Sequence, residues 1–300
     1  MGKLAKVCLV IAAIMIALGL FVGTIVTALG GGNLIRAAAN NGIVNITPWG
    51  MNFWDWGWNW GRNWNISNNH WNGGFELTVN GDRVADNSYS KDFSFDNIDS
   101  LYITVGVGEF NVIPWDKNVF KIKITGVGAC RYYERGSTLH VDGFDFTGWT
   151  TTNLNTRNNK MTLYVPESIY YDEINIEVGV GSLDISGLTS RRLRSDSGVG
   201  SLNMNGMSTE RLTMTNGIGE AKFRGVVNGD VSVDTGIGSV RLQIEGNEND
   251  FNYDISCSIG SVVVGKQSYS GLANDRRINN NADKNMRLNC AIGEITVTFY

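Results

Sequence analysis

Four segments of the chain decide the fold: INIEVGVGSLDISGL (174–188), LRSDSGVGSLNMNGM (193–207), LTMTNGIGEAKFRGV (212–226) and VSVDTGIGSVRLQIE (231–245). Each begins 19 residues after the one before, and each carries the tetrad Gly-Val/Ile-Gly-Ser/Glu at the same place. The glycines of this turn motif are Gly179, Gly181, Gly198, Gly200, Gly217, Gly219, Gly236 and Gly238. A fixed period of this length is typical of repeat proteins, whose units bury their apolar faces by stacking.

Weaker copies of the tetrad lie on both sides of the regular array. Gly106-Val107-Gly108-Glu109 precedes it, and Gly126-Val127-Gly128 follows that copy after twenty residues. Two degenerate copies come later, at Ser258-Ile259-Gly260-Ser261 and Ala291-Ile292-Gly293-Glu294. The repeat therefore extends over most of the last two thirds of the chain.

Apolar residues recur at fixed positions around each tetrad. Counted from the central Val or Ile as position 0, they stand at positions −6, 0, +3 and +5, and we predict that all four columns face the core. Position 0 is occupied by Val180, Val199, Ile218 and Ile237. Alternation with period two on each side of the motif indicates a strand, a corner and a second strand in every unit.

One further column is expected to face inward although it is mostly polar. At position −2 it holds Val178, Ser197, Asn216, Thr235, Cys257 and Cys290. Side chains stacked from unit to unit can hydrogen-bond along the stack, so we expect a polar ladder; the alternative is a buried functional site. Cys257 and Cys290 could form a disulfide between neighbouring units. We expect two buried thiols instead, because Cys130 would remain unpaired.

These patterns predict an all-β domain, a single-stack β-solenoid, or parallel β-helix-like domain, with rungs of about 19 residues. Gly187, Gly206 and Gly225 are expected to mark a second corner. Strands are expected at 138–141 and 161–165, and solvated loops at 246–253 and 266–285. The last strand, which ends at Tyr300, is expected to form an uncovered edge of the stack.

The N-terminal region predicts membrane anchoring. Residues 7–29 carry no charge and, as a helix, would span about 35 Å, enough to cross a bilayer. Lys3 and Lys6 precede this stretch, so the N-terminus is expected inside and the rest of the chain outside the cytoplasm. The competing interpretation is a cleaved signal peptide. The expected organisation is an anchor at 1–32, a juxtamembrane linker at 33–91 and the solenoid at 92–300.

Seven of the nine tryptophans lie in a tract at residues 48–71. Trp54, Trp56, Trp58 and Trp60 alternate with other residues, so an extended chain would place four indoles on one face. We consider them candidate interface or ligand contacts. A segment resting on the outer leaflet, a flexible linker, and a platform for sugar rings or a cap on the domain all remain open.

Composition excludes several classes of function. A net charge of −4, with 18% charged residues, gives no electrostatic basis for nucleic-acid binding. The two histidines, His70 and His140, are far apart in sequence, and no metal, cofactor or catalytic motif is present. Position +4 holds Asp184, Asn203, Lys222 and Arg241, which is a mixed solvated face and not an acid pair. We therefore expect no enzyme, no cofactor and no metal site.

The unit Ile176–Leu188 and its echoes resemble a bacterial putative-adhesin family, a domain of unknown function on the surface of many Firmicutes. The resemblance covers about residues 92–300 and the anchor ending in Gly30-Gly31-Gly32. It implies a β-solenoid at the cell envelope, often associated with envelope-stress regulation, and it supplies no functional residues. The expected function is a membrane-anchored, non-catalytic binding or sensing module with an envelope-protein or glycan partner. The alternatives are a carbohydrate-binding protein or glycan-active enzyme that uses the tryptophans, and a self-associating scaffold.

Overall fold

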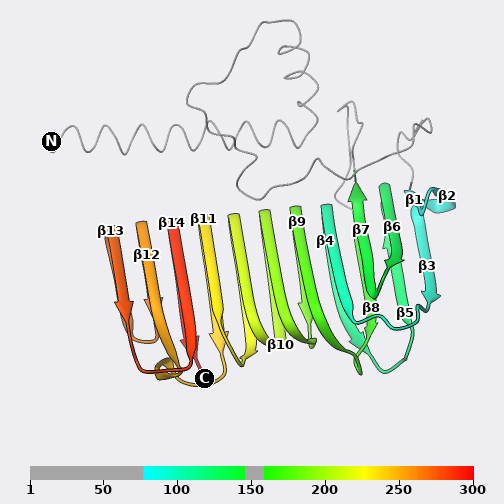
Figure 1. Ribbon diagram of the computed structural model, residues 1–300. Coiled ribbons are helices and arrows are strands. Elements are labelled where there is room, and N and C mark those ends of the chain that lie inside the picture. The colour runs from blue at the N-terminus through cyan, green and yellow to red at the C-terminus, as the bar shows by residue number, and fades with distance from the viewer. Residues whose placement is uncertain (1–76, 146–158) are drawn as a thin grey trace, which may run out of the picture. The chain divides into compact units, whose positions relative to one another are not determined.

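The computed structural model describes residues 77–145 and 159–300. The strands are β1 (Leu77–Val79), β2 (Asp82–Val84), β3 (Ser88–Phe93), β4 (Ser100–Trp115), β5 (Phe120–Thr125), β6 (Gly128–Arg135), β7 (Thr138–Asp145), β8 (Lys160–Pro166), β9 (Tyr170–Ser186), β10 (Thr189–Val227), β11 (Val231–Ile244), β12 (Phe251–Val264), β13 (Gln267–Ile278) and β14 (Lys284–Phe299). Two 3₁₀ turns, η3 (Ala85–Asn87) and η5 (Glu248–Asp250), are the only helical elements in this part of the chain. The strands stand side by side in one row (Figure 1).

The 19-residue repeat sets the register between neighbouring strands in the regular part of the row. Strands β9, β10 and β11 pair in parallel, with Leu193 opposite Ile174 and Leu212 opposite Val231. Strand β10 is long enough to supply two rungs, so four rungs in succession are offset by one repeat. The predicted β-solenoid is confirmed for the described residues.

Each long strand bends at its Gly-Val/Ile-Gly corner, and the halves before and after the corner form two layers. Buried residues alternate along both halves; in β9, for example, Ile174 and Ile176 are buried before the corner and Leu183 and Ile185 after it. No helix covers either layer in the described part of the chain, so the two layers bury each other's inner faces. The predicted inward columns at −6, +3 and +5 are confirmed.

The second glycine of the corner is required by close packing between rungs. Gly200 has φ +147°, and a Cβ added to it would lie 1.9 Å from the carbonyl oxygen of Gly181. Gly181 meets the carbonyl of Gly108 in the same way, at 2.2 Å. Any side chain there would overlap the backbone of the preceding rung. The first glycine is less constrained, because Ser258 and Ala291 occupy its place in two rungs.

The central Val or Ile of the corner does not face the core, which corrects the prediction for position 0. Val180, Val199, Ile218 and Ile237 are only half-buried. The bend places this residue on the outside of the corner, between the two strand halves whose alternate side chains point into the core. Ile259, at the same position in β12, is 36% exposed.

The polar column at position −2 is buried, as predicted. Ser197, Asn216 and Thr235 are at most 4% exposed. The Asn216 Nδ2 donates to Thr235 Oγ1 of the next rung at 3.4 Å and to the Gly219 carbonyl at 3.2 Å. The ladder is incomplete, because Asn216 Oδ1 and Ser197 Oγ are buried without a hydrogen-bond partner among the described residues. Cys257 and Cys290 face each other across adjacent rungs as free, buried thiols, so the expectation of unbonded cysteines is confirmed.

The order of rungs in space departs from their order in the chain at the C-terminal end. Strand β14 lies between β11 and β12, pairing in parallel with both (Figure 1). The row ends instead with β13, which runs antiparallel to β12. Two predictions are therefore wrong: the last strand is not an uncovered edge, and 266–285 is not a loop, because most of it forms β13. The C-terminal strand is covered because two rungs bind its two edges.

At the other end of the row the rungs become irregular. The first half of β4 pairs with β7 and its second half with β8, so the strands predicted at 138–141 and 161–165 are confirmed. Strands β5 and β6 run antiparallel to these two and share the corner Gly126-Val127-Gly128. Strands β1 and β3 pair with β6 and β5, so strands begin ahead of the boundary predicted at residue 92.

Buried Asn159 fills the corner where β8 begins. Its Oδ1 accepts a hydrogen bond from the Val127 N–H at 2.9 Å, and its Nδ2 donates to the Val127 carbonyl at 3.0 Å. Its own carbonyl accepts from the Glu109 N–H at 2.9 Å. One amide side chain thus replaces the backbone of a neighbouring strand and joins the antiparallel corner to the parallel stack.

Two predicted features lie outside the described residues: the uncharged stretch at 7–29, and the tract that holds Trp54, Trp56, Trp58 and Trp60. Over 77–145 and 159–300, the structure contains no helix long and apolar enough to cross a membrane.

Candidate functional surface

The outer face of the first layer, formed by the strand halves that precede the corners, carries three groups of side chains. In the order of the row these are an aromatic group on β6, β7 and β4, an ion-pair network on β9 and β10, and a shallow basin on β14, β12 and β13. We call this face the outer ladder face. Strand alternation fixes which residues reach it, because every second residue of each half points outward.

The aromatic group consists of Tyr133, His140 and Tyr102, which lie side by side on β6, β7 and β4. The rings of Tyr133 and His140 are parallel, with centroids 4.9 Å apart and planes 4° apart. Tyr102 lies on the other side of His140, at 5.1 Å. Strand β1 ends opposite Cys130, so no described strand lies beside Tyr133, whose side chain is 40% exposed.

Polar groups surround these rings. Arg131 forms an ion pair with Asp142 at 3.3 Å, and the Tyr102 hydroxyl donates a hydrogen bond to Glu177. Partial burial, and to a lesser extent the positive charge of Arg135, lower the pKa of His140, so its imidazole is neutral at pH 7. Burial and the bond to Glu177 raise the pKa of Tyr102, which remains a hydrogen-bond donor.

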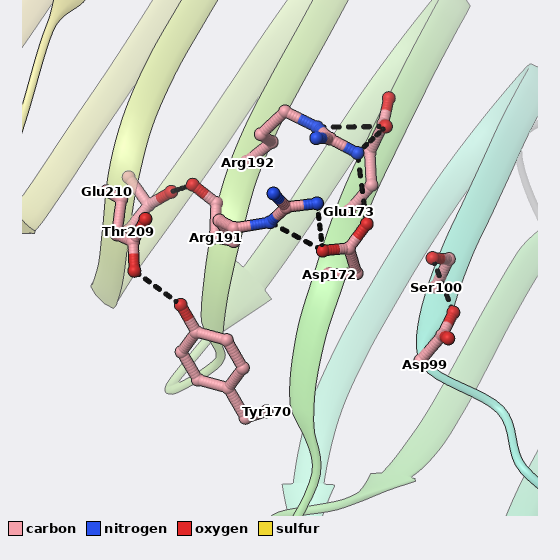
Figure 2. A network of polar contacts seen from close by, with 9 residues as sticks. All are labelled: Asp99, Ser100, Tyr170, Asp172, Glu173, Arg191, Arg192, Thr209 and Glu210. Carbon is pink, nitrogen blue, oxygen red and sulfur yellow. Dashed lines mark hydrogen bonds and ion pairs between the residues drawn. The ribbon is translucent and has the colours of Figure 1, made fainter.

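The ion-pair network lies where the rungs turn at the opposite corner. Figure 2 shows Arg191 and Arg192 of β10 reaching toward Asp172 and Glu173 of β9. Arg192 bridges both carboxylates, at 3.0 Å to each. These four groups are roughly 40% exposed and neutralise one another, so the network fixes two rungs in register and leaves little net charge for a ligand.

The basin of about 610 Å³ at the far end of the outer ladder face is lined by Asp254, Ser256, Asp275, Arg276, Arg277, Arg287 and Asn289. Several of its groups have partners: Arg277 meets Asp254 at 3.5 Å, and Ser256 Oγ donates to Asp275 at 2.7 Å. The Arg287 guanidinium makes no hydrogen bond or ion pair with any described residue. An unpaired guanidinium in a concave site suits a carboxylate or phosphate group of a ligand.

The outer face of the second layer differs, because cations cover its aromatic rings. Trp115 and Tyr164 lie 5.4 Å apart, with Lys117 at 4.9 Å from the Trp115 ring and Lys123 at 5.4 Å from that of Tyr164. The Trp115 Nε1 is also bound, to the Val119 carbonyl at 2.6 Å. The aromatic rings on this face are therefore less accessible to a ligand than the ring of Tyr133.

Sequence reasoning located the corner glycines and missed the outer ladder face. The motif glycines Gly179, Gly181, Gly198, Gly200, Gly217, Gly219, Gly236 and Gly238 all lie at corners. A Cβ added at Gly181, Gly200, Gly217, Gly219, Gly236 or Gly238 would lie less than 3 Å from a backbone carbonyl oxygen of the neighbouring rung, so these six serve close packing. Tyr133 and Arg287 gave no signal, because an irregular stretch and a 33-residue spacing hide their places in the repeat. Among residues 77–145 and 159–300, no cluster of three or more His, Cys, Asp or Glu side chains could hold a metal ion.

The fold and its surface define a β-solenoid whose flat outer faces carry polar and aromatic ladders. Residues 116–227 match the family model described as Toastrack DUF4097. This match confirms the resemblance to a putative-adhesin family of unknown function. No curated protein matches the chain.

Several solved structures are similar to this chain. A putative cell adhesion protein from Clostridium sporogenes ATCC 15579 has a TM-score of 0.45 at 13% identity, over 71% of this chain and 99% of that one. A putative adhesin from Bacteroides fragilis NCTC 9343 has a TM-score of 0.31 at 11% identity, over 70% and 96%. A putative lipid binding protein from Parabacteroides distasonis ATCC 8503 has a TM-score of 0.32 at 14% identity, over 75% and 97%.

Proposed function

We propose that the chain is a membrane-anchored, extracytoplasmic binding module that holds a partner at the cell envelope on its outer ladder face, without a chemical step. The observation that carries this proposal is the basin on β14, β12 and β13, with its unpaired Arg287. The parallel pairing of β14 with both β11 and β12 supports it, since paired neighbouring rungs hold these side chains in fixed places. The uncharged stretch at 7–29 supports the anchor.

The location is tested by protease treatment of intact cells that produce the full chain with a C-terminal epitope. The proposal predicts that external protease removes the epitope, while a cytoplasmic marker protein is retained. Protection of the epitope in intact cells, with cleavage after lysis, would contradict the predicted orientation.

The binding surface is tested by photo-crosslinking in the same cells. A photoreactive side chain at Ser232, which lies beside Arg287 in the register, should capture a discrete partner. Arg287→Ala should remove that product, because the unpaired guanidinium is the expected anchor for an acidic group. A photoreactive side chain at Lys222, on the second layer, is the matched control and should not give the same product. Capture that is unchanged in Arg287→Ala, or equal at Lys222, would contradict this surface.

A second candidate function, glycan binding, is favoured by the uncovered ring of Tyr133. Pyranose rings stack their apolar face on an aromatic ring, and adjacent carboxylates and guanidinium groups bind the hydroxyls. Tyr133 offers such a ring at the end of the Tyr133–His140–Tyr102 row, with Asp142 and Arg131 beside it. This site differs from the tryptophan tract, on which the sequence-based glycan hypothesis rested.

A glycan array with the full chain tests this alternative. Binding that Tyr133→Ala reduces at least about tenfold would support it, because loss of a stacking ring costs about 1.5 kcal/mol or more. Tyr170→Ala is the matched control, since Tyr170 is also an exposed tyrosine but lies at the opposite corner, bonded to Glu210. Absence of any bound glycan, or equal loss in both variants, would contradict glycan binding at this site.

A further inference from the structure

The corners of successive rungs place seven branched apolar side chains in one line. In the order of the row, this corner ridge consists of Ile259, Ile292, Ile237, Ile218, Val199, Val180 and Val107. All seven are partly exposed, and six steps of about 4.8 Å make the ridge about 29 Å long. A continuous exposed apolar line of this length is a candidate contact surface.

Glycines make the ridge accessible. In the regular rungs each ridge residue stands between two glycines, such as Gly217 and Gly219 around Ile218. No side chain therefore rises beside it along the chain, and the branched side chains are the outermost apolar groups of this edge. A flat surface can reach all seven at once, whereas a ligand pocket cannot form on a convex line.

The charges nearest the ridge are largely neutralised. Position +2 holds serine in four of the seven rungs and glutamate in three. Glu109 pairs with Lys160 at 2.7 Å, and Glu220 pairs with Lys222 at 2.8 Å and with Arg241. The opposite corner is different, because Asp172, Arg191 and Glu210 make it ionic (Figure 2). Of the two edges, the ridge is the one suited to an apolar phase.

The chain also connects to its remaining residues at this edge. Strand β1 begins with Leu77 opposite Gly128, the last residue of the antiparallel corner, so the preceding 76 residues join the domain there. Strand β8 is preceded by Asn159, which binds the corner residues Val127 and Glu109 at the same edge.

A second copy of the chain fits the ridge less well than a lipid surface does. Seven half-buried side chains expose on the order of a few hundred Å² in total, whereas a stable dimer buries about 800 Å² on each partner. A bilayer needs no complementary shape, and it binds apolar area that is added to an existing anchor.

We infer that the corner ridge lies against the phospholipid surface that anchors the chain, so that the rungs stand on the membrane by their Gly-Val/Ile-Gly edge. This inference rests on the anchor of the proposed function. In this orientation both outer faces are perpendicular to the bilayer, and the outer ladder face remains open to partners from the side.

Depth-dependent fluorescence quenching of the full chain in vesicles of phosphatidylethanolamine and phosphatidylglycerol tests the inference. A polarity-sensitive fluorophore is attached at Ile218→Cys, with Asn205→Cys at the opposite corner as the matched control. Cys8→Ser is the background, and Cys130, Cys257 and Cys290 are retained because they are buried. Lipids spin-labelled near the headgroup should quench the fluorophore at position 218 at least about threefold more strongly than the fluorophore at position 205. The reason is that a segment in interfacial contact reaches about 5–10 Å into the bilayer.

Two further measurements separate the outcomes. With the fluorophore at Val199→Cys, the pair Ile218→Asp and Ile237→Asp should abolish the quenching while the circular dichroism stays that of the parent. Carbonate extraction of the same vesicles reports the anchor. Equal quenching at 218 and 205 in a chain that resists extraction overturns the ridge inference and leaves the anchor standing. A chain that carbonate removes overturns the anchor, and the ridge inference with it.

Discussion

Two columns of side chains lie two residues apart in every rung, and their burial is the opposite of what their polarity would suggest. The column at position −2 is buried and largely polar, with Ser197, Asn216 and Thr235 among its members. The column at position 0 is apolar and partly exposed, with Val199 and Ile218 in the same rungs. Polarity therefore does not decide which residue faces the core at this corner. The backbone bend imposed by stacked glycines decides it, and the side chains adapt by hydrogen-bonding along the stack or by forming an exposed ridge.

Val178→Asp and Val180→Asp should give the largest contrast between the two columns. Val178 is 1% exposed, so a carboxylate there would be buried without a partner and should lower the free energy of unfolding by about 4 kcal/mol or more. Val180 is half-buried, and its carboxylate can reach water, so the loss should be about 1 kcal/mol. Urea denaturation of the full chain in detergent measures both. Equal losses would show that the two columns do not differ in burial.

Gly200→Ala and Gly206→Ala test the backbone that separates the columns. A Cβ at Gly200 would lie 1.9 Å from the Gly181 carbonyl oxygen, so the rungs must separate, at a cost of about 3 kcal/mol. Gly206 has φ +65° but no atom within 3.8 Å of the added Cβ, so the cost should be about 1 kcal/mol of backbone strain. The melting temperatures of the two variants provide the measurement. A smaller loss at position 200 than at 206 would contradict the close packing of the corner glycines.

The Cys290 thiol in the buried column should show its burial as a pH dependence of stability. Burial and the neighbouring Cys257 raise the pKa of Cys290 to about 12, above its usual range near 8.5–9. The folded state then holds a proton that the unfolded state releases, so this contribution is complete below pH 9 and is lost as the pH rises toward 12. Unfolding free energies at pH 7.5 and 10 should differ more in the parent than in Cys290→Ala. Alkylation of native Cys290 at pH 8 at the rate of an unfolded chain would contradict this burial.

Ser197→Val should give the smallest effect and the only gain. The Ser197 hydroxyl is buried and lacks a hydrogen-bond partner among the described residues, while the neighbouring rung carries Val178 in the same column. Replacing the hydroxyl with apolar volume should raise the free energy of unfolding by about 1 kcal/mol. Ser201→Val, which is exposed in the same rung, is the matched control and should change it little. A loss of stability at position 197 would show that the column has no room for a larger side chain.

The repeat period and the apolar alternation predicted most of the fold. The part that they did not predict depends on pairing between strands far apart in the sequence. The period of 19 predicted which residues of β9, β10 and β11 stack, because register there equals sequence spacing. It could not place β14, whose partner Val231 lies 55 residues before Met286. The alternation on each side of the tetrad predicted inward columns, but counting alone put Val199 in the core, since the direction of a side chain at a bend depends on the bend itself.

The candidate surface was less predictable than the fold for the same reason. Tyr133, His140 and Tyr102 come from three strands that share no repeat period, so only the folded register brings their rings together. Arg287 belongs to the basin only because β14 lies between β11 and β12, which the sequence spacing does not indicate. The glycines, in contrast, were visible at once, because a packing requirement repeats whenever the rung repeats.

The insertion of β14 between β11 and β12 has a consequence for the order in which the chain can fold. Strands β9 to β11 can add to the stack as each emerges in chain order, because each binds the strand that precedes it in the chain. The hairpin of β12 and β13 emerges next, and its proper neighbour does not yet exist. Until Lys284–Phe299 has emerged, β11 and β12 both expose an edge that can pair with the other. A chain that emerges from its N-terminal end therefore passes through a state in which β11 and β12 can pair wrongly with each other. The final stack requires the last strand to be inserted between them and not simply added.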